Sequence, residues 1–143
     1  MSDAHFQKLT RMYLGAPINR YFAPRIEISR GQAVVTLPVR EDFHHAASAV
    51  HGAVYFKALD DAAFFAANSL VDDVFVLTVA FTIHFTRPVR DGTITATGRV
   101  VHHSRRMLIA DVEAVDASGK VVARGTGTFM RSEISLTADI GYA

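Results

Sequence analysis

Two adjacent carboxylates in one mostly apolar segment have the residue type and the setting that acid-base chemistry needs. In a helix, residues three and four apart share a face, so Asp61 would lie beside Lys57, with which it can form an ordinary solvated ion pair. Asp60 instead falls in line with Phe56 and Phe64, in an apolar stripe. Burying a carboxylate is costly unless it is paired or hydrogen-bonded, which makes Asp60 a candidate catalytic group. It could instead accept hydrogen bonds in a purely structural role.

A second candidate feature is Gly52, near the start of the same segment. The first N–H groups of a helix have no partners within it, and the positive end of the helix dipole favours negative charge, so these groups could bind a substrate oxygen. At 1.5 Å per residue, an oxygen held there would lie roughly 10 Å from Asp60 along the helix axis. One reacting atom cannot touch both features within one subunit. Two copies lying antiparallel across a dimer interface would bring one helix start to the other chain's carboxylate.

The segment that carries these residues, 50–70, is predicted to form one long helix. Apolar side chains occupy almost its whole circumference, and such a helix must be enclosed by protein or lipid. Charges near the centre of a membrane-spanning helix are costly, so Lys57, Asp60 and Asp61 argue against lipid. We therefore expect a helix buried in the protein core.

Length and composition predict a single globular domain over residues 1–143. Half of the residues are hydrophobic, which is enough for a sizeable core. The formal net charge of +1 gives no reason to expect a nucleic-acid partner, and the absence of cysteine excludes disulfides and thiolate metal sites. Residues 1–14 lack the charged start and apolar centre of a secretory signal, so the expected location is the cytoplasm, with no membrane association.

The remaining elements follow from hydrophobic periodicity. An amphipathic helix is expected at 3–14, and the alternation of apolar residues predicts strands at 25–30, 33–39, 77–85, 93–103, 107–115 and 120–131. In the third of these strands one face should carry Leu77, Val79, Phe81, Ile83 and Phe85. Consecutive antiparallel strands after one buried helix predict an α+β domain in which the sheet curls around the helix. Exposed edge strands and the uncovered side of the helix then favour oligomerisation.

Two motifs resemble the hotdog-fold thioesterases of the phenylacetate-degradation (PaaI) type. The first is His51-Gly52-Ala53 followed by Asp60, and the second is the stretch at 82–88, Thr-Ile-His-Phe-Thr-Arg-Pro. The resemblance covers residues from about 25 to about 132, which leaves the N-terminal helix and a short C-terminal tail outside it. It implies a hotdog fold and a homodimer, commonly paired into a homotetramer. It also implies hydrolysis of acyl-CoA thioesters at sites between subunits, without a cofactor.

The resemblance also implies roles for individual residues. Asp60 matches the family's carboxylate, which acts as a general base on water or as a nucleophile, and Thr78 falls where some relatives position the water with a hydroxyl. Gly52 and Ala53 match the two residues whose main chain polarises the thioester carbonyl, with alanine in place of the second glycine. His45 stands where the family usually has asparagine, and it can both donate a hydrogen bond and titrate near neutral pH.

His45 keeps a second reaction open. Hotdog dehydratases and hydratases pair a histidine in the loop before the helix with an acid on the helix, and His45 with Asp60 has about that separation. A third possibility is a non-catalytic domain that binds acyl-CoA or regulates, because a shared fold does not fix function. Release of coenzyme A from a panel of acyl-CoAs distinguishes the thioesterase from both alternatives.

The substrate-binding candidates each have a structural alternative. His51 could contact substrate or only orient its loop, and the aromatic side chains at helical spacing could line an acyl pocket or simply fill the core. The arginines near strand ends could bind the phosphates of coenzyme A or remain on the solvated surface. These candidates are Tyr55, Phe56, Phe64, Arg87, Arg105 and Arg106. No ligand spacing typical of zinc is present, so no metal is expected, and the acyl group itself is not specified.

Overall fold

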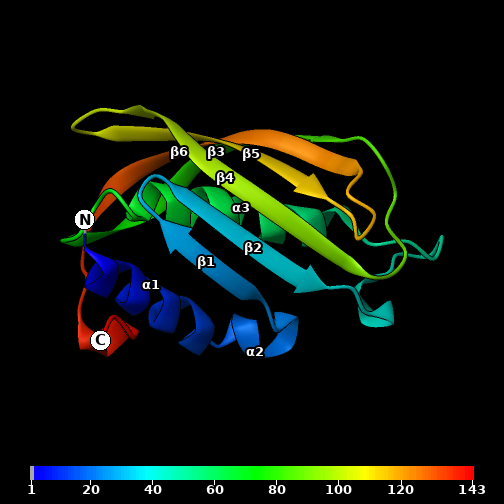
Figure 1. The fold of residues 1–143 in the computed structure, drawn as a ribbon, viewed down its shortest axis with the longest axis horizontal. Coiled ribbons are helices and arrows are strands. Elements are labelled where there is room, and N and C mark those ends of the chain that lie inside the picture. Colours follow the sequence, from blue (N-terminus) through cyan, green and yellow to red (C-terminus); the bar gives the residue numbers. More distant parts are fainter. Residues whose placement is uncertain (1) are drawn as a thin grey trace.

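The computed structural model describes residues 2–143 and contains six strands and three α-helices (Figure 1). The helices are α1 (Asp3–Gly15), α2 (Ile18–Phe22) and α3 (Gly52–Asn68). The strands are β1 (Arg25–Ser29), β2 (Gln32–Pro38), β3 (Val74–Phe85), β4 (Thr93–His103), β5 (Met107–Val115) and β6 (Val121–Ser135). Short 3₁₀ helices occur at Glu41–Phe43 and Ala138–Ile140. The predicted helix at 50–70 and all six predicted strands are present, with small shifts at their ends.

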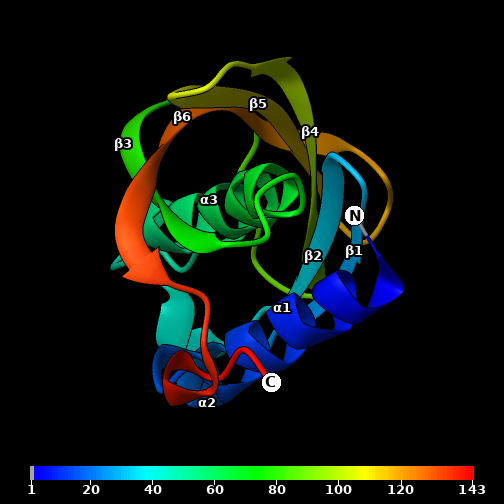
Figure 2. The same cartoon turned by 90° about the vertical axis from the view of Figure 1, so that its left-hand side faces the viewer.

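The strands form one antiparallel sheet in the order β1-β2-β4-β5-β6-β3. Figure 2 shows the sheet curving over α3, with α1, α2 and the C-terminal residues on the opposite side of that helix. The α+β class and the wrapping of the sheet around a buried helix are therefore as predicted. Because β1 and β3 end the sheet, each has one edge without a partner strand among residues 2–143.

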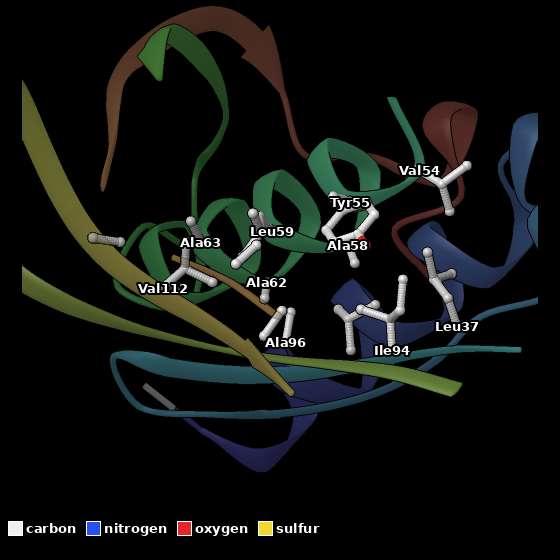
Figure 3. Packing of buried hydrophobic residues seen from close by; sticks show 14 of the residues in the cluster. Leu37, Val54, Tyr55, Ala58, Leu59, Ala62, Ala63, Ile94, Ala96 and Val112 are labelled. Atoms are coloured by element: carbon white, nitrogen blue, oxygen red, sulfur yellow. The ribbon is translucent and has the colours of Figure 1, made fainter. Parts of the chain in front are cut away.

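Small side chains let α3 lie very close to the sheet. Ala58 and Ala62 are completely buried, and Figure 3 shows this side of the helix packed against residues of β2, β4 and β5. At Gly98 of β4, a Cβ atom would lie 2.6 Å from the carbonyl oxygen of Ala62. Glycine is required at this position because the backbone of the helix already fills the space that a side chain would take.

The Gly98→Ala variant should therefore be less stable by about 1–3 kcal/mol, since the added methyl group must displace backbone atoms rather than a flexible side chain. Thermal unfolding measures the change. Gly15→Ala is the matched control, because a Cβ atom there meets nothing within 4 Å. Equal stability of the two variants would contradict the close approach of α3 to β4.

A buried asparagine connects the end of α3 to the start of β3. Asn68 has no exposed surface; its side-chain oxygen accepts from the N–H of Val76 at 3.0 Å, and its amide donates to the carbonyls of Val71 and Val74. These bonds satisfy backbone groups in the tight connection. They also fix how β3 approaches the middle of α3.

The predicted single apolar face of β3 is wrong in its first half. A β-bulge between Thr78 and Ala80 changes the register with β6, so the side chains on either side of the bulge do not alternate as a regular strand would. Leu77 and Val79 are 45% and 53% exposed, whereas Val76 is buried. An extra residue in a strand leaves no mark in the alternation of residue types. Because of the bulge, Thr78 lies on the face of β3 that contacts α3.

Two features outside the sheet were not predicted. The five-residue helix α2 follows Pro17, where the sequence indicated only the end of the first helix. In addition, the buried His5 of α1 connects three segments: its Nε2 donates to the carbonyl of Asn68 at 3.0 Å, and its Nδ1 accepts from the hydroxyl of Tyr142 at 2.7 Å. α1 and the last residues of the chain are thereby attached to the end of α3.

Candidate active site

Asp60 lies in the middle of α3, on the side that faces the bulge of β3. The hydroxyl of Thr78 donates to Oδ1 of Asp60 at 2.8 Å. Burial raises the pKa of Asp60 from its usual value of 3.8 to about 6, and the hydrogen bond from Thr78 opposes that rise. Asp60 is thus a carboxylate in a largely apolar setting that is still ionised near neutral pH. That is the state in which a carboxylate can accept a proton from water.

Asp60 and Thr78 lie in the wall of an open pocket of about 770 Å³. α3 contributes Phe64 to the same wall, and β3 contributes Phe75 and Leu77. The opposite wall comes from α1, α2 and the C-terminal residues, which include Tyr13, Ile18 and Ile140. The pocket therefore combines one candidate catalytic carboxylate with mainly apolar and aromatic side chains, as is usual for sites that bind small molecules.

The pair formed by Lys57 and Asp61 is mostly buried rather than solvated, which corrects the expectation from the sequence. Lys57 Nζ lies 2.5 Å from Oδ2 of Asp61, and the two side chains are only 12% and 14% exposed. The hydroxyl of Tyr13, on α1, donates to the same oxygen at 2.6 Å. The helical spacing correctly predicted the pair. It could not indicate that α1 packs over it, so that Tyr13, Lys57 and Asp61 all line the pocket of Asp60.

The start of α3 forms part of a second pocket of about 420 Å³. Its lining includes His45, Gly52, Tyr55, Phe85 and Arg87, and it contains neither Asp60 nor Thr78. The chain thus carries the carboxylate and the helix start at two separate places, as the helical rise predicts. His45 and Asp60 likewise do not share a pocket within one chain.

The two N–H groups expected to polarise a carbonyl differ in their availability. His51 is the N-cap of α3, and its Nδ1 accepts from the N–H of Ala53 at 2.9 Å. Gly52 N–H, as the first N–H of the helix, has no acceptor among residues 2–143. Gly52 is therefore the free donor in this structure. His51 orients the loop, which is one of the two roles considered for it.

His45 also organises the loop before α3. Its Nδ1 accepts from the N–H of Ala47 at 3.0 Å, and its carbonyl accepts from Ser48, whose φ of 62° is in the left-handed region. Its side chain faces the pocket of Gly52. The role of His45 in chemistry stays a prediction.

The other substrate-binding candidates are divided between the two pockets or lie outside them. The hydroxyl of Tyr55 donates to the carbonyl of Arg87 at 2.8 Å, so this tyrosine is fixed in the second pocket. Phe56 stacks edge-on against Phe81 of β3 and lines neither pocket. Arg105 and Arg106 are exposed in the β4–β5 turn, at the opposite end of the sheet from Gly52, which packs against Phe85.

Within residues 2–143, no three His, Cys, Asp or Glu side chains are grouped as a metal site. Nor is any helix in this part of the chain both long enough and apolar enough to cross a membrane.

Comparisons with known proteins give consistent matches. The model of the thioesterase superfamily matches residues 47–123, which include the helix start, Asp60 and Thr78. The acyl-coenzyme A thioesterase PaaI of Escherichia coli is 32% identical over 115 residues, which are 80% of this chain and 81% of that protein.

Solved structures extend the likeness to the whole fold. The structure of the E. coli PaaI protein from the phenylacetic acid degradation operon matches with a TM-score of 0.86 and 29% identity, over 95% of this chain and 99% of the other. A mutant of the phenylacetic acid degradation protein PaaI from Thermus thermophilus has a TM-score of 0.74 and 28% identity, over 82% of this chain and 100% of that one.

Proposed function

Because the chain belongs to the thioesterase superfamily, we propose that it is an acyl-CoA thioesterase, which hydrolyses a thioester to a free acid and coenzyme A. The predicted hotdog fold is confirmed by the likeness to the E. coli PaaI structure. The observation that carries the proposal is Asp60: one of its oxygens is held by Thr78, its pKa is raised to about 6, and it lies in a pocket large enough for an acyl group.

The proposed reaction uses Asp60 on water or directly on the thioester. As a general base, Asp60 takes a proton from water while the water oxygen attacks the carbonyl carbon. The carbonyl oxygen becomes an oxyanion, which the N–H of Gly52 at the start of a neighbouring helix stabilises. The carbon–sulfur bond then breaks, and the proton passes from Asp60 to the departing thiolate. As a nucleophile, Asp60 would attack the carbonyl carbon, and the carbon–sulfur bond would break to expel the thiolate and leave an anhydride between Asp60 and the acyl group. Water would then hydrolyse the anhydride to the free acid and the Asp60 carboxylate, and a proton from water would go to the thiolate.

The two features must come from different subunits, because they line separate pockets in one protomer. The free edge of β3 is the surface that fits a second copy. Leu77, Val79 and Phe85 are among the exposed large apolar residues of the chain, and all three lie on this edge strand. Phe56 adds to them from the neighbouring side of α3. We propose a homodimer that pairs these edges and brings each helix start to the partner's Asp60. Two such dimers would form the homotetramer.

The Val79→Asp variant tests the shared site. A charge at the β3 edge should dissociate the dimer and lower kcat/KM by more than about 100-fold, because each Asp60 loses the N–H donor that the other subunit supplies. Analytical ultracentrifugation and thioesterase assays at matched protein concentration measure both effects. Val101→Asp is the control, since Val101 is similarly exposed but lies on β4. A fully active monomer would contradict the proposal.

The decisive experiment for the function itself is release of coenzyme A from a panel of aliphatic and aromatic acyl-CoAs. Turnover with at least one of them supports a thioesterase. Binding of acyl-CoA without turnover would indicate a binding or regulatory domain instead. A change in the acyl chain with the thioester intact would indicate hydratase chemistry, which would require His45 of one subunit to reach Asp60 of the other.

A further inference from the structure

The mostly buried group formed by Tyr13, Lys57 and Asp61 has no part in the reaction described above, although it lies in the same pocket as Asp60. One oxygen of Asp61, Oδ2, accepts from both the ammonium group of Lys57 and the hydroxyl of Tyr13, at 2.5 and 2.6 Å. Burying a charged pair is costly, so its presence beside the candidate catalytic carboxylate requires a reason. The reason offered here rests on the proposed function.

Lys57 has two carboxylates within reach. It lies three residues before Asp60 and four before Asp61, and both spacings place side chains on neighbouring positions of a helix surface. An ammonium group on Asp60 would lower the pKa of that carboxylate and occupy the oxygen that has to accept a proton from water. Thr78 already binds Oδ1 of Asp60, so Oδ2 is the remaining acceptor.

Contacts from α1 and α2 keep the ammonium group on Asp61. The ring of Tyr13 lies 5.2 Å from Lys57 Nζ, and the ring of Phe22 lies 5.4 Å from it, so two aromatic faces contact the cation while Asp61 binds it. Tyr13 is 4% exposed and stacks edge-on against Phe65. Burial raises the pKa of Tyr13, so its hydroxyl stays protonated and donates to Asp61.

We infer that Asp61 is a positioning residue: held by Tyr13, it binds Lys57 and thereby leaves Asp60 without a counter-ion and free to act on water. The other groups around Asp60 are consistent with this role. Thr78, from β3, is uncharged, and Asp139 of the C-terminal segment lines the same pocket but carries the wrong sign to pair with a carboxylate. The nearby charges of Lys57 and Asp61 act on the pKa of Asp60 in opposite directions, so the effect of burial remains.

The test is a pair of variants. Asp61→Asn should release Lys57 to Asp60, which lowers the pKa of Asp60 by about 1 unit or more and reduces kcat about tenfold at neutral pH. The acid limb of the pH profile of kcat/KM should move down with it, from near pH 6 in the wild type. Adding Lys57→Met to Asp61→Asn should restore both kcat and the limb, because no cation is left to pair with Asp60. A residue that only supports packing would not give this recovery.

Tyr13→Phe keeps the aromatic ring and removes only the hydrogen bond to Asp61. It should shift the acid limb of the pH profile in the same direction as Asp61→Asn, by a smaller amount. An NMR titration of the Asp60 carboxyl carbon measures the pKa of Asp60 directly and needs no turnover. It is made on the wild type, Asp61→Asn, the double variant and Tyr13→Phe. An unshifted carboxyl titration in Asp61→Asn, or a double variant as impaired as the single one, would overturn the inference. If the wild type and Asp61→Asn hydrolyse acyl-CoA equally well, the proposed function stands and only the positioning role fails. If no acyl-CoA is hydrolysed, the titration still decides the positioning role.

Discussion

The Asp60→Asn variant should lose at least about 10³-fold in kcat for every acyl-CoA that the wild-type protein hydrolyses. Asparagine has nearly the same shape and can still accept the hydrogen bond from Thr78, but it can neither take a proton from water nor attack a thioester. Steady-state release of coenzyme A measures kcat. Equilibrium binding of the same acyl-CoA should be largely retained, because the pocket keeps its shape.

Two further variants distinguish a loss of the catalytic carboxylate from a loss of folding or of carboxylate charge in general. Asp91→Asn removes an exposed carboxylate outside the pocket and should leave kcat unchanged. Thr78→Val removes only the hydrogen bond to Asp60, so its effect should be smaller than that of Asp60→Asn, on the order of tenfold. Wild-type turnover by Asp60→Asn would remove this carboxylate from the mechanism.

The same Asp60→Asn substitution should stabilise the folded protein at pH 8. The folded-state pKa of about 6 lies above the usual value of 3.8, so the native structure holds the ionised carboxylate at a cost. A difference of this size corresponds to about 3 kcal/mol at 1.36 kcal/mol per pKa unit. Because the carboxyl is only partly buried and the asparagine amide also needs hydrogen bonds, we expect a gain of about 1–2 kcal/mol, or about 5 °C in Tm.

The pH dependence of this gain has a definite sign. A raised carboxyl pKa favours the folded state below pH 3.8, and that contribution is lost as the pH rises through about 6. The difference in Tm between the variant and the wild type should therefore be largest at pH 7–8 and should shrink towards pH 4. Differential scanning calorimetry at several pH values measures it, with Asp91→Asn as the neutral control. A variant less stable than the wild type at pH 8 would mean that ionised Asp60 is stabilised in the native state.

Hydrophobic periodicity was sufficient to predict most of the fold. The apolar circumference of α3 predicted a buried helix, and alternation predicted each strand, because burial on one or two sides leaves a direct pattern in the residue types. The bulge at Thr78–Ala80 was missed because it depends on pairing with β6 and leaves no pattern in the residue types. α2 was missed because five residues are too few to show a helical period.

The candidate site was predictable only in part. Asp60 was identifiable as a carboxylate in an apolar stripe, and the helical rise already predicted that Gly52 and Asp60 of one chain lie too far apart to act on the same atom. Tyr13 was not identified, because a tyrosine in the apolar stripe of an amphipathic helix has the pattern of an ordinary core residue. Its contact with Asp61 joins residues that are 48 positions apart, and no local pattern carries such information.

His5 and Tyr142 attach α1 and the C-terminal residues to the end of α3, so these two segments lie beside the pocket without belonging to the sheet. In the proposed reaction the sheet and α3 supply the reacting groups, whereas one wall of the pocket comes from two outlying segments that pair with no strand of the sheet. Substitutions in these outlying segments can change the size and polarity of the pocket while the geometry of bond breaking stays intact. In the proposed thioesterase, the preference for one acyl group over another can therefore change through α1 and the C-terminal residues while Asp60 and Thr78 stay in place.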